Sequence, residues 1–302
     1  MQWRSTLGES NPDVGLRPFF VAVSHIEHIA AGWRIGSWSV DMYETLTLEF
    51  SGQLATLTLN RPDKRNAINS KMVSEIQSAL DEIENGRTRV AIVTGAGKSF
   101  CAGMDLEMLS DIASQSSAEN MDDSRRMGKM FRRIWGFSKP LIAAVNGAAL
   151  AGGCGIATLC DFTLSVPEAK FGYTEVKIGF LPAIVSVFLT RQIGDKQARN
   201  LLLTGRLVEA TEALSLGLVT EIVPRERLMQ RALELADVLI AASPVSLTRA
   251  KRLLTSAASA SVDEDLERAI LENARIRCTA DFKEGLASFL EKRKPVWSTD
   301  VE

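Results

Sequence analysis

The stretch from Ala144 to Asp161 constrains the fold of this 302-residue chain most strongly, because it carries four glycines within an apolar run. The apolar residues 141–145 predict a strand, the glycines that follow predict a turn, and the run from Gly152 predicts an apolar helix. Where a strand passes through glycines into a helix, backbone N–H groups lack partners and the positive end of the helix dipole lies behind them. The stretch therefore predicts a binding site for negative charge.

A second stretch, from Ser99 to Leu106, repeats this pattern on a smaller scale. It follows the apolar strand 90–93 and two glycines, Gly95 and Gly97. Two such loops that face each other would supply two N–H donors to one oxygen atom. The alternative for each loop alone is a tight turn that lets a helix and a strand pack closely.

Several motifs in order carry a family resemblance. FCAGMDL (100–106), VNGAALAGGCGIATLCD (145–161) and KFGYTE (170–175) are joined by NRPDKRNA (60–67) and by DFKEG (281–285). The region 42–297 resembles the crotonase superfamily, the enoyl-CoA hydratases and isomerases. The resemblance implies an α/β fold with a spiral core of ββα units, a helical C-terminal region that forms trimers, and a homotrimer or a dimer of trimers.

The resemblance also implies the catalytic groups. The backbone N–H groups of Met104 and Gly152 would form the oxyanion hole that holds a thioester carbonyl, and Glu175 would be the acid/base. An apolar neighbourhood would raise the pKa of Glu175 toward the range that is useful for proton transfer. The alternative for Glu175 is a carboxylate at a helix N-terminus. Asp161, which ends the glycine stretch, fits a structural role better.

Gly155 is the main departure from the family pattern. Hydratases with two catalytic glutamates carry the first one at this position, and the pair holds the attacking water. Members with a single glutamate include double-bond isomerases, which move one proton between C4 and C2, and also some hydratases. A dienoyl isomerase is disfavoured because residues 176–191 contain no further acid. A second departure is the apolar segment 181–188, which replaces a glycine-rich segment of many relatives and would reshape the acyl pocket.

Coenzyme A would enter as part of the substrate, and the sequence predicts no other cofactor and no metal. By resemblance, Lys64 and Arg65 face the nucleotide, Lys292 reaches the coenzyme A of a neighbouring subunit and Phe289 flanks the ligand. The neighbours of Met104 would border the nucleotide, namely Ala102, Asp105 and Leu106, although Asp105 also fits a structural role. The alternative for the basic residues is an ordinary solvated surface.

Composition excludes several other classes of function. A net charge of −2 gives no basic field for nucleic acid, and no apolar run is long enough to cross a bilayer. The four cysteines show no metal or disulfide spacing, which favours reduced thiols in the core of a cytoplasmic protein. Both histidines, His25 and His28, precede residue 42, so a histidine-dependent nucleophile in the core is excluded.

The chain divides into three parts, by prediction: an extension of unknown role (1–41), a core domain (42–240) and a helical C-terminal region (241–302). The core begins with a hairpin over residues 46–59 and a helix over 71–85. Polar residues predict a loop at 111–124, with helical spacing from 125 to 135. From residue 195 onward the spacing predicts a series of helices, over 195–204, 210–216, 225–241, 245–258 and 263–292.

The sequence therefore favours an enoyl-CoA hydratase, with an enoyl-CoA isomerase as a close alternative because of Gly155. A decarboxylase of malonyl-type thioesters needs the same oxyanion hole and one proton donor. A relative that binds acyl-CoA or RNA without turnover is disfavoured, because both oxyanion loops and Glu175 are present and the charge balance is acidic.

Overall fold

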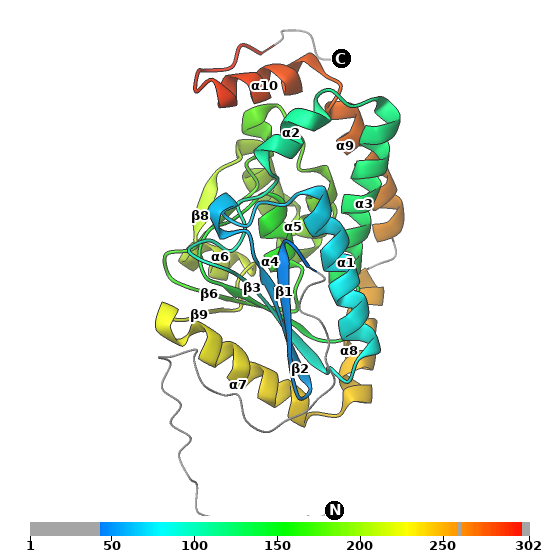
Figure 1. Ribbon diagram of the computed structural model, residues 1–302, viewed down its shortest axis with the longest axis vertical. Coiled ribbons are helices and arrows are strands. Elements are labelled where there is room, and N and C mark those ends of the chain that lie inside the picture. The colour runs from blue at the N-terminus through cyan, green and yellow to red at the C-terminus, as the bar shows by residue number, and fades with distance from the viewer. Residues whose placement is uncertain (1–42, 259–260, 298–302) are drawn as a thin grey trace, which may run out of the picture. The chain divides into compact units, whose positions relative to one another are not determined.

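A six-stranded sheet in the order β1-β2-β3-β4-β6-β9 forms the centre of the fold (Figure 1). A computed structural model describes residues 43–258 and 261–297, within a unit that spans 40–302. The strands are β1 (Leu46–Ser51), β2 (Leu54–Leu59), β3 (Val90–Gly95), β4 (Leu141–Val145), β6 (Phe162–Ser165) and β9 (Glu221–Ile222). The first two form the predicted antiparallel hairpin, and all later neighbours are parallel. The central strands β3 and β4 are buried nearly throughout, as expected for parallel strands that are covered on both faces.

Helices cover both faces of this sheet. Side chains of α1 (Ser70–Asn85), α3 (Ser117–Trp135) and α4 (Gly152–Thr158) share a core with those of β2, β3 and β4. From the other side, α7 (Leu228–Ala241) packs against β3, β4 and β6 (Figure 1). The side chain of Asn69 caps α1 by accepting a hydrogen bond from the Met72 amide at 2.9 Å.

A second, three-stranded sheet continues from the glycine stretch. It consists of β5 (Ala149–Leu150), β7 (Lys170–Gly172) and β8 (Leu207–Glu209), in that order. The strands β8 and β9 were not predicted, because they have only three and two residues. A parallel bridge joins Cys101 to Ala149, so the two glycine-bearing loops lie side by side.

Gly147 allows this close approach of the two loops. A Cβ atom at this position would lie 2.0 Å from the backbone oxygen of Lys98. We expect Gly147→Ala to lower the free energy of unfolding by more than about 3 kcal/mol, because backbone on both sides leaves no room to adjust. Urea denaturation would measure the change, and Ala96→Gly in the neighbouring loop, expected within about 1 kcal/mol of the wild type, is the control. An unchanged midpoint in the Gly147 variant would contradict the close approach.

The segment predicted as a loop over 111–124 is mostly helical, and that prediction is wrong. The helix α2 (Leu106–Ile112) ends within it, and α3 already begins at Ser117. Ser116 and Glu119 form a capping box, with the Ser116 amide 2.9 Å from a carboxylate oxygen of Glu119. Three polar residues of this first half of α3 are buried, namely Asn120, Asp123 and Ser124. Their partners lie far along the chain, which is why a polar segment reads locally as a loop.

The C-terminal half is mainly helical, as predicted, apart from the short strands β8 and β9 and one predicted helix that divides. The remaining helices are α5 (Ala183–Thr204), kinked at Gly194, α6 (Ala210–Leu216), α8 (Pro244–Ala258), α9 (Val262–Ile276) and α10 (Ala280–Leu290). The predicted single helix over 263–292 is therefore wrong, since it divides into α9 and α10. Thr279 separates the two helices because it caps the N-terminus of α10, where its hydroxyl accepts a hydrogen bond from the Phe282 amide at 3.2 Å.

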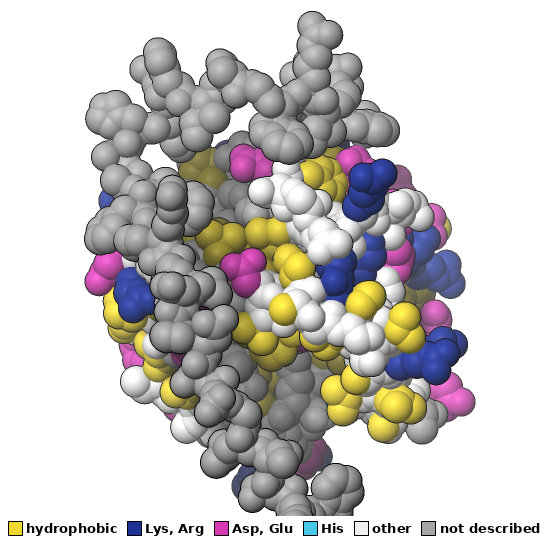
Figure 2. Space-filling view, turned by 90° about the horizontal axis from the view of Figure 1, so that it is seen from below, with side chains coloured by type: hydrophobic (Ala, Val, Ile, Leu, Met, Phe, Trp, Pro, Cys, Tyr) yellow, Lys and Arg dark blue, Asp and Glu magenta, His cyan; other side chains and the backbone are white. Residues whose placement is uncertain are grey.

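Hydrophobic side chains are also exposed at one side of the protein, as Figure 2 shows. Large examples on α7 and α8 are Leu233, Val238, Val245, Leu253 and Leu254.

Of the four cysteines, Cys101, Cys154 and Cys160 are buried free thiols, whereas Cys278 is exposed, so its prediction as a core thiol is wrong. No helix in the described ranges is long and apolar enough to cross a membrane. The predicted extension 1–41, with both histidines, lies outside the described residues.

Candidate active site

The amide of Met104 is free because of how its neighbours pair. Met104 forms a parallel bridge with Ile68, in which Ile68 donates to the Gly103 carbonyl at 2.7 Å and accepts from the Asp105 amide at 2.8 Å. In such a bridge the central residue turns its own N–H group to the opposite side. Within the described part of the chain, no hydrogen bond uses the Met104 amide. It is therefore a spare donor on the side away from Ile68.

The amide of Gly152 becomes available at the sharp turn between β5 and α4. Ala151 has a φ of 50°, which is unusual for a residue with a side chain, and donates to the Gly172 carbonyl at 2.7 Å. Gly152 is the first residue of α4, where an amide has no acceptor within the helix. The described residues supply none from elsewhere. A Cβ atom at Gly103 would meet the Ala151 side chain at 2.9 Å, so the two loops press together here.

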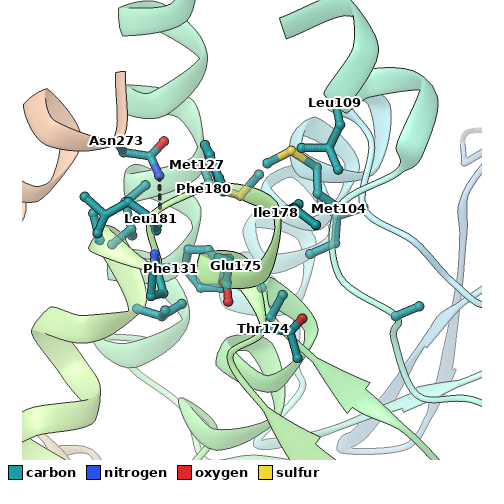
Figure 3. Close-up of a pocket in the computed structure, with 18 of the residues that line it drawn as sticks. Met104, Leu109, Met127, Phe131, Thr174, Glu175, Ile178, Phe180, Leu181 and Asn273 are labelled. Carbon is teal, nitrogen blue, oxygen red and sulfur yellow. Dashed lines mark hydrogen bonds between the residues drawn. The ribbon is translucent and has the colours of Figure 1, made fainter. Parts of the chain in front are cut away.

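Both amide-bearing residues line one cavity of about 160 Å³, which Figure 3 shows in close-up. Its wall is mainly apolar, and it includes Ile68, Leu109, Met127, Phe131, Ile178, Phe180, Leu181, Pro182, Ala183, Ile184 and Val185. Of the lining side chains in the described part of the chain, three are polar, those of Thr174, Glu175 and Asn273. Five residues of the segment 181–188 contribute to this wall, so the sequence departure there does shape the cavity.

Among the residues that the structure describes, Glu175 is the ionisable one in this wall. It begins the short 3-10 helix η3 (Glu175–Ile178), is only 8% exposed, and its Oε2 atom has no hydrogen-bond partner among the described residues. Burial raises the pKa of Glu175 to about 7, against a smaller lowering by its own backbone amide. At neutral pH the carboxyl group is thus close to half ionised. A group of this kind can both accept and return a proton.

The backbone of α10 holds η3 in place. A Cβ atom at Gly285 would lie 2.3 Å from the carbonyl group of Ile178, and one at Gly179 would lie 2.3 Å from the Asp281 oxygen. The C-terminal helix and the segment that carries Glu175 are therefore in backbone contact at two points. This explains why the DFKEG motif belongs to the same pattern as the two glycine loops.

Phe131 and Val185 fill the space beside Gly155. A Cβ atom on Gly155 would lie 2.8 Å from Val185 Cγ1 and 2.9 Å from Phe131 Cε1. Both side chains also line the cavity, and both are buried. The position that carries a second glutamate in some hydratases is therefore occupied by hydrocarbon in this protein. The sequence identified the glycine, but the residues that replace the carboxylate come from α3 and α5.

The predicted coenzyme A contacts fall into two groups. Ala102, Leu106 and Phe289 line the cavity, and the last two are half exposed, at 44% and 52%, as residues at its mouth should be. Lys64 is exposed and forms an ion pair with Glu107 at 2.7 Å. Arg65 is exposed too, and its carbonyl accepts from the Ala102 amide at 3.0 Å. Lys292 is exposed just after α10 and does not line the cavity.

Asp105 is turned away from the cavity toward protein partners. Its side chain caps α2 by accepting from the Glu107 amide at 3.0 Å, and it lies 2.7 Å from the guanidinium of Arg61. Asp161 is likewise held by protein groups, the Leu141 amide at 2.7 Å and Lys251 at 2.5 Å.

The sequence analysis did not predict two of the lining residues, Asn273 and Phe131, which lie on apolar helix faces. In the described ranges no group of three acidic, histidine or cysteine side chains is arranged to hold a metal.

Comparisons with known proteins agree with this geometry. The model of the family described as enoyl-CoA hydratase/isomerase matches residues 49–300. A Thermus thermophilus protein, provisionally named an enoyl-CoA hydratase, is 43% identical over 245 residues, which are 81% of this chain and 97% of that protein. A short-chain-enoyl-CoA hydratase of Clostridium acetobutylicum is 37% identical, with 82% and 95% covered. The solved structure of an enoyl-CoA hydratase/isomerase from Xanthobacter autotrophicus Py2 superposes with a TM-score of 0.77 at 31% identity, covering 83% and 97%.

Proposed function

Because the chain belongs to the enoyl-CoA hydratase/isomerase family, we propose that it is an enzyme that adds water to a 2-enoyl-CoA thioester. The predicted crotonase-like α/β fold and family are confirmed by the same matches. The observation that carries the proposal is the convergence of two spare amides and one unpartnered carboxyl group on a single apolar cavity.

The amides of Met104 and Gly152 would hold the thioester oxygen. Negative charge grows on this oxygen as the enolate forms, and donors fixed in a dry site stabilise it most at that moment. Each donor would lower the barrier by roughly 3 kcal/mol. The apolar wall supports this role, because it keeps competing water away from the oxygen.

Glu175 would move the protons. In hydration its carboxylate would take a proton from the water that attacks C3 and return a proton to C2 of the enolate. The raised pKa supports this double role, since neither protonation state is strongly favoured near pH 7. Coenzyme A enters as part of the substrate, and we propose no resident cofactor.

The pH dependence should follow Glu175, whose pKa burial raises to about 7. Only the carboxylate can take the first proton, so we expect kcat/KM to rise nearly tenfold per pH unit up to about pH 7 and to level off above it. Initial rates from pH 5 to pH 9 at low substrate concentration would measure this. A profile that is flat or falling over the whole range from pH 5 to pH 9 would exclude Glu175 as the base.

A double-bond isomerase is the second candidate, and the filled space beside Gly155 favours it. Phe131 and Val185 offer no hydrogen bond to an attacking water, so Glu175 would have to orient it alone. Isomerisation of a 3-enoyl-CoA requires no water, because one base removes a proton at C4 or C2 and returns it at the other carbon. The names of the relatives favour hydration, and the shape of the cavity favours isomerisation.

One experiment separates the two reactions. Purified protein would be incubated in deuterated water with crotonyl-CoA and, separately, with a 3-enoyl-CoA, and products followed by mass spectrometry. Formation of 3-hydroxybutyryl-CoA supports hydration with a single glutamate. Reaction of the 3-enoyl substrate alone, to the 2-enoyl isomer, supports the isomerase. Inactivity toward both contradicts both candidates for these acyl groups.

The nucleotide of coenzyme A would lie at the mouth of the cavity, near Leu106 and Phe289, with Lys64 and Arg65 close to the phosphates. Lys292 would act toward a neighbouring subunit, because it does not line its own cavity. A homotrimer or a dimer of trimers is part of this proposal, and the hydrophobic side chains exposed on α7 and α8 support assembly. Light scattering coupled to size-exclusion chromatography would give the oligomeric state. Location in the cytoplasm stays a prediction.

A further inference from the structure

The proposed reaction leaves two polar side chains of the described cavity wall without a task, Thr174 and Asn273, and the buried one of the two is Asn273. It comes from α9, is 5% exposed and stands among apolar residues of the wall. Burying an amide at an apolar surface costs free energy unless its hydrogen-bonding groups find partners. The question is therefore which of its groups are satisfied by the protein and which face the ligand.

Its orientation follows from the donors around it. The Oδ1 atom accepts from Ser124 Oγ at 3.0 Å and from Arg277 Nη2 at 2.9 Å. A guanidinium can only donate, so the oxygen must be the atom that faces Arg277. The Nδ2 atom then points the other way, where it donates to the Leu181 carbonyl at 3.4 Å (Figure 3). One long bond uses at most one of its two hydrogens, so an N–H group is left for a ligand.

Asn273 lies beyond the reacting carbons when viewed from the proposed oxyanion hole. In Figure 3, Asn273 and Met104 lie on opposite sides of Glu175. A thioester whose oxygen is held at the Met104 amide and whose C2 is beside Glu175 would extend its acyl chain toward Asn273. This step rests on the proposed function. In this placement, the spare N–H group of Asn273 contacts the far end of the acyl group.

The charges behind Asn273 favour a negative partner. Arg277 has a fully buried side chain and pairs with Asp123 at 2.8 Å, and Asp123 pairs also with Arg126 at 3.2 Å. Two guanidinium groups thus share one carboxylate in this cluster. Arg277 also lies 5.7 Å from the ring centre of Phe180, which lines the cavity. The side chain of Arg126 is 55% exposed and is screened by solvent, whereas Arg277 is buried and donates to Asn273 itself, so the positive end of the Arg277–Asp123 pair faces Asn273.

We propose that Asn273 binds a carboxylate at the end of the acyl chain, and that the enzyme acts on coenzyme A thioesters of unsaturated dicarboxylic acids. The spare N–H group donates to the carboxylate, and the buried guanidinium of Arg277 behind Asn273 supplies the favourable potential. The apolar side chains between Glu175 and Asn273 bind the methylene groups.

Binding of saturated acyl-CoA thioesters tests this without turnover. Pairs of equal chain length, from four to eight carbons, would end either in a methyl group or in a carboxylate, and calorimetry would give their dissociation constants. We expect the carboxylate member to bind at least tenfold more tightly at one length or more. Equal or tighter binding of the methyl member at every length would overturn the proposal. A protein that binds neither member of any pair would overturn the proposed function, and this inference with it.

Asn273→Asp is the matching variant. Its remaining oxygen still accepts from Ser124 and Arg277, while the donor is replaced by a negative acceptor that faces the Leu181 carbonyl. Circular dichroism therefore has to show first that the variant is folded. We expect the preference for the carboxylate member to fall at least tenfold, and the affinity for the methyl member to change by less than about threefold. Asn200→Asp, which adds the same charge on the exposed side of α5, should keep the preference. A preference that survives in Asn273→Asp would show that Asn273 is structural only.

Discussion

Glu175→Gln should lower kcat by about 10³- to 10⁴-fold while leaving substrate binding nearly unchanged. Positioned general acid/base groups contribute up to about that factor, and no second carboxyl group among the described residues lines the cavity to take over. The amide has the same shape but cannot exchange a proton. The measurement is kcat and KM on whichever enoyl-CoA substrate proves active, with Glu49→Gln, exposed on β1, as the control. A Gln variant within tenfold of the wild type would exclude Glu175 as the acid/base.

The same substitution should stabilise the protein at high pH. Burial raises the pKa of Glu175 from 4.5 to about 7, so the unfolded chain releases this proton more readily than the folded one. The buried charge therefore lowers the stability of the wild type. This loss of stability is absent below about pH 4.5, grows between pH 4.5 and 7, and is constant above pH 7. A difference of about 2.5 pKa units corresponds to about 3 kcal/mol.

Urea denaturation at several pH values would measure this linkage. The stability of Glu175→Gln relative to the wild type should rise by about 3 kcal/mol between pH 4.5 and pH 8. A gain that does not depend on pH would assign the effect to packing instead of to the charge. Loss of activity combined with gain of stability is the pattern expected of a group whose buried position is maintained for its chemistry.

The sequence predicted the site best where the pattern is local. A strand, a turn of glycines and a helix over 141–158 follow directly from the residue types, and the structure has β4, β5 and α4 there. The prediction failed for the first half of α3, because Asp123 and Ser124 are buried against Arg277 and Asn273, some 150 residues later. A polar segment that is satisfied by distant partners carries no local signal.

The same reasoning applies within the cavity. Gly155 was identified from the sequence as a missing carboxylate, but a glycine does not reveal what occupies the space it leaves. Asn273 lies on α9 and Arg277 caps the end of this helix four residues later, a spacing that places two polar groups on one side of a helix. That spacing is common on solvated surfaces too, so only the packing of α9 against α3 distinguishes a buried network from an exposed pair.

Restoring a glutamate at position 155 should damage this protein. Its Cβ atom would lie within 3 Å of both Val185 and Phe131, so Gly155→Glu must displace packed side chains and bury a charge among them. Overpacking costs about 1–3 kcal/mol, and an unpartnered buried charge costs several more. We expect a loss of at least about 4 kcal/mol in the free energy of unfolding, with no gain in hydration rate. Gly155→Gln is equal in size but neutral. Its loss of stability measures the overpacking alone, and the difference between the two variants measures the burial of the charge.

A double-mutant cycle tests the packing directly, even if the glutamate variant does not fold. Gly155→Ala alone should cost about 1–3 kcal/mol. Val185→Ala removes the Cγ1 atom that the new Cβ would meet at 2.8 Å, so the double variant should be more stable than the sum of the single changes by about 0.5–3 kcal/mol. Additive effects would mean that Gly155 and Val185 do not compete for space. A Gly155→Glu variant that is as stable as the wild type and hydrates faster would show room for a second carboxylate, and the isomerase alternative would lose its main support.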